Sequence, residues 1–160
     1  MFVSSSGYVE LHCHSAFSFL DGASLPEELV TAALELGHRE LALTDHNTVS
    51  GSMEFAQAAA SLGLRAIHGA ELDLDDGHHV TVLVEDASGW SSLCRLLTRA
   101  HAHTRDSPRR EMGEPKVGLA DLEAHPAVAR REHARPQGHA APPFTRWYSA
   151  TPRCGSSCSC

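Results

Sequence analysis

In residues 8–100, short apolar runs of strand length alternate with stretches in which apolar residues recur at helical spacing. The predicted elements are strands at 8–13, 40–44, 64–72 and 79–84 and helices at 24–37, 50–63 and 86–100. A turn at 75–77 is expected to join the last two strands as a hairpin. Strands that alternate with helices predict an α/β fold with a mainly parallel sheet or barrel and helices outside it.

His12 and His14 stand two residues apart where the first predicted strand ends. Successive side chains on a strand point to opposite faces, so this spacing places both imidazoles on one face. Imidazole suits zinc, iron or manganese, and Asp21 adds a carboxylate just downstream. Taken alone, the pair is explained equally well by two surface histidines in a chain that has 12 of them.

Further candidate ligands follow the next two predicted strands. His46 comes just after the strand at 40–44, and Glu71 lies near the end of the strand at 64–72. In parallel α/β folds, chemistry gathers at the carboxyl ends of the strands. One shared metal site is therefore predicted from four residues at three strand ends, namely His12, His14, His46 and Glu71.

The formal net charge of −7 is unevenly distributed. Residues 1–104 carry 4 Lys/Arg and 14 Asp/Glu, whereas residues 105–160 carry 9 and 6. Phosphate backbones need clustered Lys and Arg, so the acidic part is not expected to bind nucleic acid on its own. Acidic residues are expected around a metal site if their carboxylates serve the metal.

Five cysteines at 13, 94, 154, 158 and 160 form an odd set with three crowded at the end. This is not typical of a disulfide framework, so we expect a reducing, cytoplasmic location. The last three lack a Cys-x-x-Cys pair, which does not favour zinc binding there. We expect neither a signal peptide nor a membrane span, because no apolar run has the required length or flanks.

The pattern changes after residue 104. Residues 104–115 are predicted to form an exposed loop, and residues 117–125 to begin another helix. From residue 126 the chain is rich in Arg, Pro, Ala, Gly and Ser without periodicity, and such a segment buries too little apolar surface to offset its ordering entropy. We predict an incomplete domain at 1–125 and an irregular, disordered tail at 126–160. A frame change or truncation near residue 127 is the hypothesis that explains the change.

Four blocks of this sequence resemble the first blocks of the PHP domain (polymerase and histidinol phosphatase). They are LHCHS at 11–15, LDG at 20–22, LTDH at 43–46 and GAE at 69–71. The blocks at 79–84, 86–90 and 93–101 resemble the version at the N-terminus of bacterial C-family DNA polymerases. Among these polymerases, the resemblance favours the error-prone paralogue. The resemblance covers residues 8–125 and implies part of a distorted (β/α)7 barrel.

Carried over residue by residue, the resemblance implies a site for two or three divalent ions of zinc, manganese or iron. Its implied ligands are His12, His14, Asp21, His46, Glu71 and His79. Asp45 is expected to orient an imidazole from outside this set. His79 fits the strand-end pattern least, because it begins a strand, and its neighbour His78 is easily confused with it. His101 and His103 are expected at the surface.

The later blocks of the family are not found after residue 125. They are a Ser-Gly-Cys-like segment and an Asp-x-His block, which supply further ligands in the family. Their absence implies an incomplete site, weak metal binding and a chain with little or no activity of its own. An incomplete barrel also leaves unpaired sheet edges, so we expect low stability.

The leading hypothesis is a PHP-domain fragment of an error-prone C-family DNA polymerase, which acts in damage-tolerant replication and repair. Its metals would hydrolyse a phosphoester such as a DNA 3′ end, or serve a structural role. DNA would be bound by downstream domains that this chain lacks. Two alternatives stay open, a small stand-alone phosphoesterase for a phosphorylated metabolite and a non-catalytic module. The block at 86–101 favours the polymerase over the stand-alone enzyme.

Overall fold

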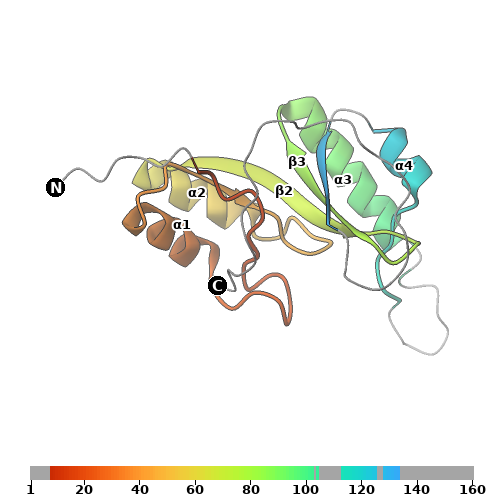
Figure 1. Cartoon of the computed structure of the whole chain (residues 1–160), viewed down its shortest axis with the longest axis horizontal. Coiled ribbons are helices and arrows are strands. Elements are labelled where there is room, and N and C mark those ends of the chain that lie inside the picture. The colour runs from red at the N-terminus through yellow and green to blue at the C-terminus, as the bar shows by residue number, and fades with distance from the viewer. Residues whose placement is uncertain (1–7, 103, 105–112, 126–127, 134–160) are drawn as a thin grey trace.

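The computed structural model describes residues 8–102, 104, 113–125 and 128–133, the last of these by their backbone (Figure 1). The elements are α1 (Pro26–Glu35), β1 (Glu40–Leu43), α2 (Ser52–Leu62), β2 (Arg65–Asp73), β3 (His79–Val84), α3 (Ala87–His101), α4 (Leu119–Glu123) and β4 (Val128–His133). Every helix and strand predicted between residues 24 and 100 is present, and α4 confirms the helix expected within 117–125. The α/β class is therefore confirmed.

The described strands form one mixed sheet in the order β1-β2-β3-β4. β1 and β2 are parallel and are connected through α2, whereas β2–β3 and β3–β4 are antiparallel pairs. The prediction of a mainly parallel sheet is therefore wrong for these strands. The physical reason is the predicted hairpin at 75–77, which returns β3 beside β2 without a crossover helix.

The segment at 8–13 runs beside β1 without forming a regular strand, which corrects the strand predicted there. One isolated parallel bridge joins Glu10 to Leu41. Further along, the Cys13 carbonyl accepts a hydrogen bond from the Thr44 amide at 2.9 Å, and the Thr44 hydroxyl accepts one from the Cys13 amide at 3.1 Å. A side chain thus takes the place of a ladder bond, and the extended segment still delivers His12 and His14 to the end of β1.

Strand β4 lies in the segment for which the sequence predicts irregular chain. It pairs with β3 along its whole length, from Val84 opposite Val128 to His79 opposite His133. The prediction is wrong at Val128–His133, because backbone pairing with the free edge of β3 needs no apolar periodicity in the incoming strand. Residues 134–160, with the three clustered cysteines, lie outside the described residues, so the disordered tail and the frame change stay predictions.

Two groups of helices cover the sheet, with α1 and α2 near one end of β2 and α3 and α4 near the other (Figure 1). One core cluster joins α1, β1 and α2 and includes Leu29, Val30, Leu43, Phe55 and Ala59. The other joins β2, β3, α3 and α4 and includes Leu72, Val80, Val82, Leu93, Leu96 and Leu122. Residues 66, 70 and 72 of β2 contribute to these clusters, so the even-numbered face of β2 is the buried one and the odd-numbered face is left for other contacts.

His68 lies on the buried face of β2, between the two core clusters. Its ring meets Phe55 of α2 and Trp90 of α3 edge to face, with ring centroids 5.7 and 5.8 Å away. Its Nδ1 is buried and has no hydrogen-bond partner among the described residues. Burial lowers the pKa of His68, because the charged imidazole would lose its solvation there.

We expect this histidine to make the fold sensitive to acid. Below about pH 6.5 the unfolded chain binds a proton at His68 that the folded chain does not bind, so the free energy of unfolding falls as the pH decreases. One such proton gives a slope of at most about 1.4 kcal/mol per pH unit. Urea unfolding measures this effect at pH 7.5 and at pH 5.5. Between these two pH values, the free energy of unfolding should fall less in His68→Phe than in the wild type. Equal losses in the two proteins would contradict this role.

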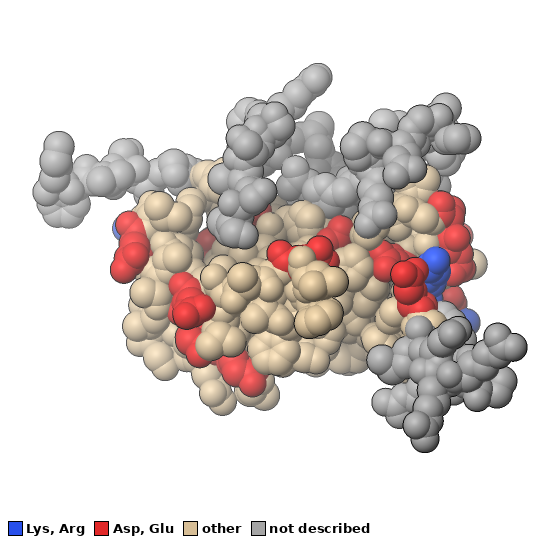
Figure 2. All heavy atoms as spheres, turned by 90° about the horizontal axis from the view of Figure 1, so that it is seen from below, with Lys and Arg blue, Asp and Glu red and all other residues tan. Residues whose placement is uncertain are grey.

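Among the described charged side chains on the face that Figure 2 shows, Asp and Glu are prominent, whereas Lys and Arg are few. Two of the described arginines form exposed ion pairs, Arg65 with Glu40 at 2.9 Å and Arg99 with Asp121 at 2.8 Å. Among the described residues, this face therefore offers no basic patch for a phosphate backbone. None of the helices in the described ranges is long and apolar enough to cross a membrane.

Candidate metal centre

Glu71 and Asp73 lie near the end of β2, two residues apart and therefore on the same, odd-numbered face of the strand. The loop after β1 is bound to this strand end. The backbone amide of Asn47 donates to the Glu71 carbonyl at 2.7 Å, and the backbone amide of Glu71 donates to the Asp45 carbonyl at 3.1 Å. His46, which lies between these two anchor points, is thereby held against the carboxylates.

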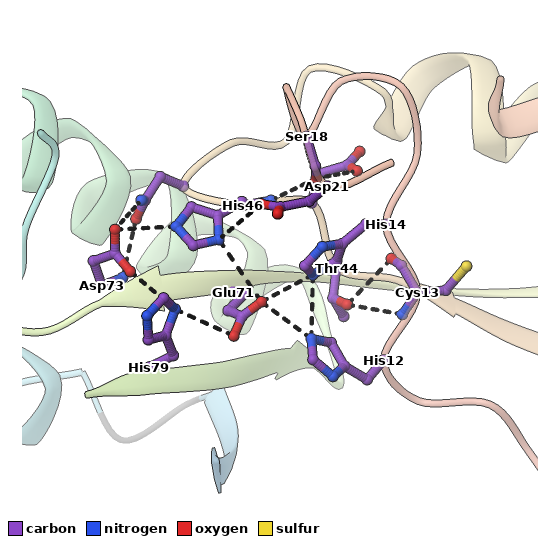
Figure 3. A network of polar contacts seen from close by, with 12 residues as sticks. His12, Cys13, His14, Ser18, Asp21, Thr44, His46, Glu71, Asp73 and His79 are labelled. Carbon is purple, nitrogen blue, oxygen red and sulfur yellow. Dashed lines mark hydrogen bonds and ion pairs between the residues drawn. The ribbon is translucent and has the colours of Figure 1, made fainter. Parts of the chain in front are cut away.

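His12, His14 and Glu71 form a first group of candidate ligands (Figure 3). The two histidine Nε2 atoms are 3.1 Å apart, and they lie 3.1 and 2.9 Å from Glu71 Oε2. Ligand atoms at about 2.1 Å from one ion are separated by roughly 3 Å when they occupy neighbouring positions. The separations in this group therefore fit three ligands of a single divalent ion.

His46, Asp73 and His79 form a second group beside the first. Asp73 Oδ2 lies 3.0 Å from His46 Nε2, and Asp73 Oδ1 lies 3.0 Å from His79 Nδ1. Glu71 stands between the two groups, since its carboxylate is also 3.8 Å from His46 Nδ1 and 3.4 Å from His79 Nδ1. Four imidazoles thus converge on one carboxylate that is only 7% exposed.

His79 belongs to this cluster although it begins a strand. β3 is antiparallel to β2, and His79 is the register partner of Asp73. The start of an antiparallel strand lies at the same sheet edge as the end of its neighbour, which removes the conflict with the strand-end pattern. The adjacent His78 is 43% exposed in its side chain and contacts Asp76 at 3.0 Å, outside the cluster.

The two remaining predicted residues lie apart from both groups. The Asp21 carboxylate is half exposed and 3.8 Å from His46 Nδ1. The Asp45 carboxylate is buried and accepts hydrogen bonds from the Ser15 amide at 2.7 Å and from the hydroxyls of Ser15 and Ser18 at 2.8 Å each. Asp45 therefore holds the loop at 15–18 rather than an imidazole, which corrects its predicted role. Ser18 also contacts the neighbouring residue His46, because the Ser18 hydroxyl accepts a hydrogen bond from the His46 backbone amide at 2.9 Å.

The cluster concentrates negative charge at a partly buried place. Hydrogen bonds to Asp73 and to Glu71 raise the pKa of His46 to about 10. Burial alone would raise the pKa of Glu71, but hydrogen bonds from His12, His14 and His46 outweigh it and hold that pKa far below its usual range. The carboxylates stay ionised and require compensating positive charge, which protonated imidazole supplies here and a divalent ion can supply instead.

Asp73 was not among the residues predicted from the sequence. The available signal was its spacing from Glu71, which repeats the two-residue spacing of His12 and His14. His101, expected at the surface, is exposed but also approaches the Asn47 carbonyl with Nε2 at 2.8 Å.

A cleft of about 290 Å³ opens beside the cluster. It is lined by residues that include Phe17, Phe19, Asp21, His46 and His101. Phe19 is 86% exposed, so the aromatic side of this cleft faces solvent. The cleft leaves room for a small group next to the candidate ligands.

The profile of the PHP domain matches residues 10–141 of this chain. The chain belongs to the PHP domain family. The match continues past residue 125, where the sequence pattern suggests that the domain stops, and it includes strand β4.

Curated relatives of this PHP chain include error-prone DNA polymerases. The enzyme of Mycolicibacterium paratuberculosis is 49% identical over 129 residues, which cover 74% of this chain and 11% of the relative. That of Symbiobacterium thermophilum is 49% identical over 94 residues, which cover 59% of this chain and 9% of the relative. The chain therefore spans about a tenth of the length of the relatives that it matches.

Two solved structures share the fold over part of the chain. A protein from Bifidobacterium adolescentis, described as a metal-dependent phosphoesterase, has a TM-score of 0.51 at 27% identity, with coverage of 64% of this chain and 36% of that chain. An amidohydrolase from Chromobacterium violaceum, with bound sulfate and no metal, has a TM-score of 0.50 at 33% identity, with coverage of 59% and 34%. One structural neighbour of this PHP domain is thus described by its assignment to the metal-dependent phosphoesterases.

Proposed function

We propose that this chain is the PHP part of an error-prone C-family DNA polymerase and that its histidine–carboxylate cluster binds divalent ions for phosphoester hydrolysis. The observation that carries the proposal is the convergence of His12, His14, His46 and His79 on Glu71, at distances between 2.9 and 3.8 Å. Mixed imidazole and carboxylate donors suit zinc, manganese or iron. When bound, such ions activate water and stabilise the negative oxygens of a phosphoester.

The residues of the chain have distinct roles in this proposal. The histidines and Glu71 bind the ions, and Asp21 is a further ligand that approaches from the exposed side. The loop at 15–18, held by Asp45, keeps His14 and Asp21 close to the end of β2. The cleft beside His46 receives the group attached to the phosphoester.

The polymerase relatives suggest where the rest of the function resides. We propose that polymerisation and DNA binding belong to parts of a longer parent, because this chain corresponds to about a tenth of those relatives and its described surface is acidic. The complete parent would close the (β/α)7 barrel and add the later family ligands. On this proposal the chain by itself binds ions weakly, has little or no hydrolytic activity, and works in the cytoplasm.

Metal binding is tested by replacing His79 and His78 separately. We expect His79→Ala to lower the affinity for manganese or zinc by more than about 10-fold, because it removes an imidazole that faces Glu71 and Asp73. His78→Ala is the matched control and should bind like the wild type, since the His78 side chain pairs with the turn residue Asp76 and belongs to neither group of candidate ligands. Equilibrium dialysis with elemental analysis measures both. Equal losses in the two variants, or none in either, would refute the assignment.

The polymerase part of the proposal is tested on the gene. The coding DNA from codon 120 onward is resequenced and translated in all three forward frames. We expect one frame to continue with a Ser-Gly-Cys-like segment and a later Asp-x-His block. If no frame contains them, the stand-alone phosphoesterase becomes the better hypothesis, and phosphorylated metabolites become the substrates to assay.

A further inference from the structure

Asp73 holds a position that the predicted ligand set does not explain. Its two carboxylate oxygens face different imidazoles, Oδ2 towards His46 Nε2 and Oδ1 towards His79 Nδ1, each at 3.0 Å (Figure 3). The side chain is 19% exposed, so water solvates it only in part. An ionised carboxylate in such a place needs several partners with fixed directions.

Asn47 supplies that fixed direction. Its side-chain nitrogen donates to Asp73 Oδ2 at 3.0 Å, and its side-chain oxygen accepts from the Asp73 amide at 3.1 Å. One amide group therefore binds both the backbone and the carboxylate of the same residue. Asn47 adopts a left-handed conformation with φ 52°, which asparagine tolerates better than most residues.

The two oxygens of Asp73 are not equivalent. Oδ2 accepts from Asn47 and pairs with His46, whereas Oδ1 is buried and makes no hydrogen bond among the described residues. Oδ1 nevertheless lies 3.0 Å from His79 Nδ1. The contact is an ion pair when His79 is protonated, and a separation near 3 Å also suits two ligands of one ion, which would give Oδ1 a partner when the imidazole is neutral.

We propose that Asp73 is a metal ligand, and that it forms a second divalent-ion position with His46 and His79, next to the position at His12, His14 and Glu71. Asn47 is its positioning residue. This inference rests on the proposed function, because it requires that the cluster binds metal at all. Two imidazoles and one carboxylate favour manganese, iron or zinc at this position.

All three ligands of the second position come from residues 46–79, on the loop after β1, the end of β2 and the start of β3. The position therefore does not depend on the ligands that the later family blocks supply. The second position is formed entirely by described residues, as is the first position at His12, His14 and Glu71.

The competing role for Asp73 is that of an outside hydrogen-bond acceptor for His46. In that case Nδ1 of His46, which is 3.8 Å from both Asp21 and Glu71, would be the metal-binding atom. Loss of such an acceptor typically lowers metal affinity 10- to 100-fold, roughly, without removing an ion. Loss of a ligand from a three-residue position removes the ion, so the number of bound ions distinguishes the two roles.

The experiment counts cobalt(II) ions bound to the full 160-residue chain after dialysis against a chelator, by equilibrium dialysis and by visible absorption of the bound cobalt. The variants are Asp73→Asn, Asn47→Ala and the control Asp76→Asn, which removes the same charge at an exposed turn. We expect two bound cobalt ions in the wild type and in Asp76→Asn. Asp73→Asn should bind one cobalt ion, and the visible absorption of cobalt at the first position should be unchanged in this variant. Asn47→Ala should bind the second ion at least about 10-fold more weakly.

The unchanged first position shows that Asp73→Asn is still folded. A wild type that binds no cobalt overturns the proposed function and the inference with it. A wild type that binds two ions, together with an Asp73→Asn variant that also binds two, overturns only the inference. A single ion in both proteins overturns it as well, because the second position would then not exist.

Discussion

Glu71→Gln is expected to lower the affinity of the whole cluster for divalent ions by more than about 100-fold, beyond the effect of losing an outer hydrogen bond. Glu71 is the carboxylate on which four histidines converge, at distances from 2.9 to 3.8 Å. Glutamine has the same size but is neutral, and its amide nitrogen would point a donor at imidazoles that need an acceptor. Both ion positions share Glu71 as a neighbour, so both should weaken.

Isothermal titration with manganese measures this effect, and Glu54→Gln is the control. Glu54 is an exposed residue of α2, so its replacement changes the net charge equally without touching the cluster. Thermal unfolding should show that Glu71→Gln remains folded without metal. Wild-type affinity in Glu71→Gln would show that the imidazoles bind the ions without this carboxylate, and the proposed site would be wrong.

Gly22→Ala is expected to reduce the free energy of unfolding by at least about 3 kcal/mol, at the upper end of the range for overpacked sites. A Cβ at Gly22 would overlap the carbonyl of Ser15 and lie 2.9 Å from the carbonyl oxygen of His14. These are backbone atoms, and Asp45 holds the Ser15 amide and hydroxyl in place, so neither side can move cheaply. A domain with a total stability of about 5–15 kcal/mol would lose a large share of it.

Urea unfolding of Gly22→Ala and of the control Gly77→Ala tests this prediction. Gly77 has φ 86° in an open turn where a Cβ meets nothing within 4 Å, so alanine there should cost only about 1–2 kcal/mol of backbone strain. Gly22→Ala should also weaken metal binding, since it displaces the backbone of His14, whereas Gly77→Ala should not. A smaller loss in Gly22→Ala than in Gly77→Ala would mean that the loop at 15–22 is free to rearrange.

The candidate metal ligands differ in how far the sequence could predict them. His12, His14, His46 and Glu71 follow from strand ends alone, and the structure brings these four together. His79 came from the family resemblance. The predicted hairpin would also have placed it here, because an antiparallel strand begins at the sheet edge where its neighbour ends. Asp73 was missed although its spacing from Glu71 had the same period as the histidine pair. The repeat became informative only once β2 was known to extend to Asp73.

The helices and the strands β1, β2 and β3 could be predicted from the sequence, because apolar periodicity and turn residues are local properties of the chain. The same patterns place four candidate ligands at predicted strand ends. Contacts in the folded chain were needed to establish that Val128–His133 pairs with β3 and that Asn47 fixes Asp73 between two imidazoles. Those features depend on contacts between residues far apart in the chain, and their energies arise from register and burial, which no local pattern contains.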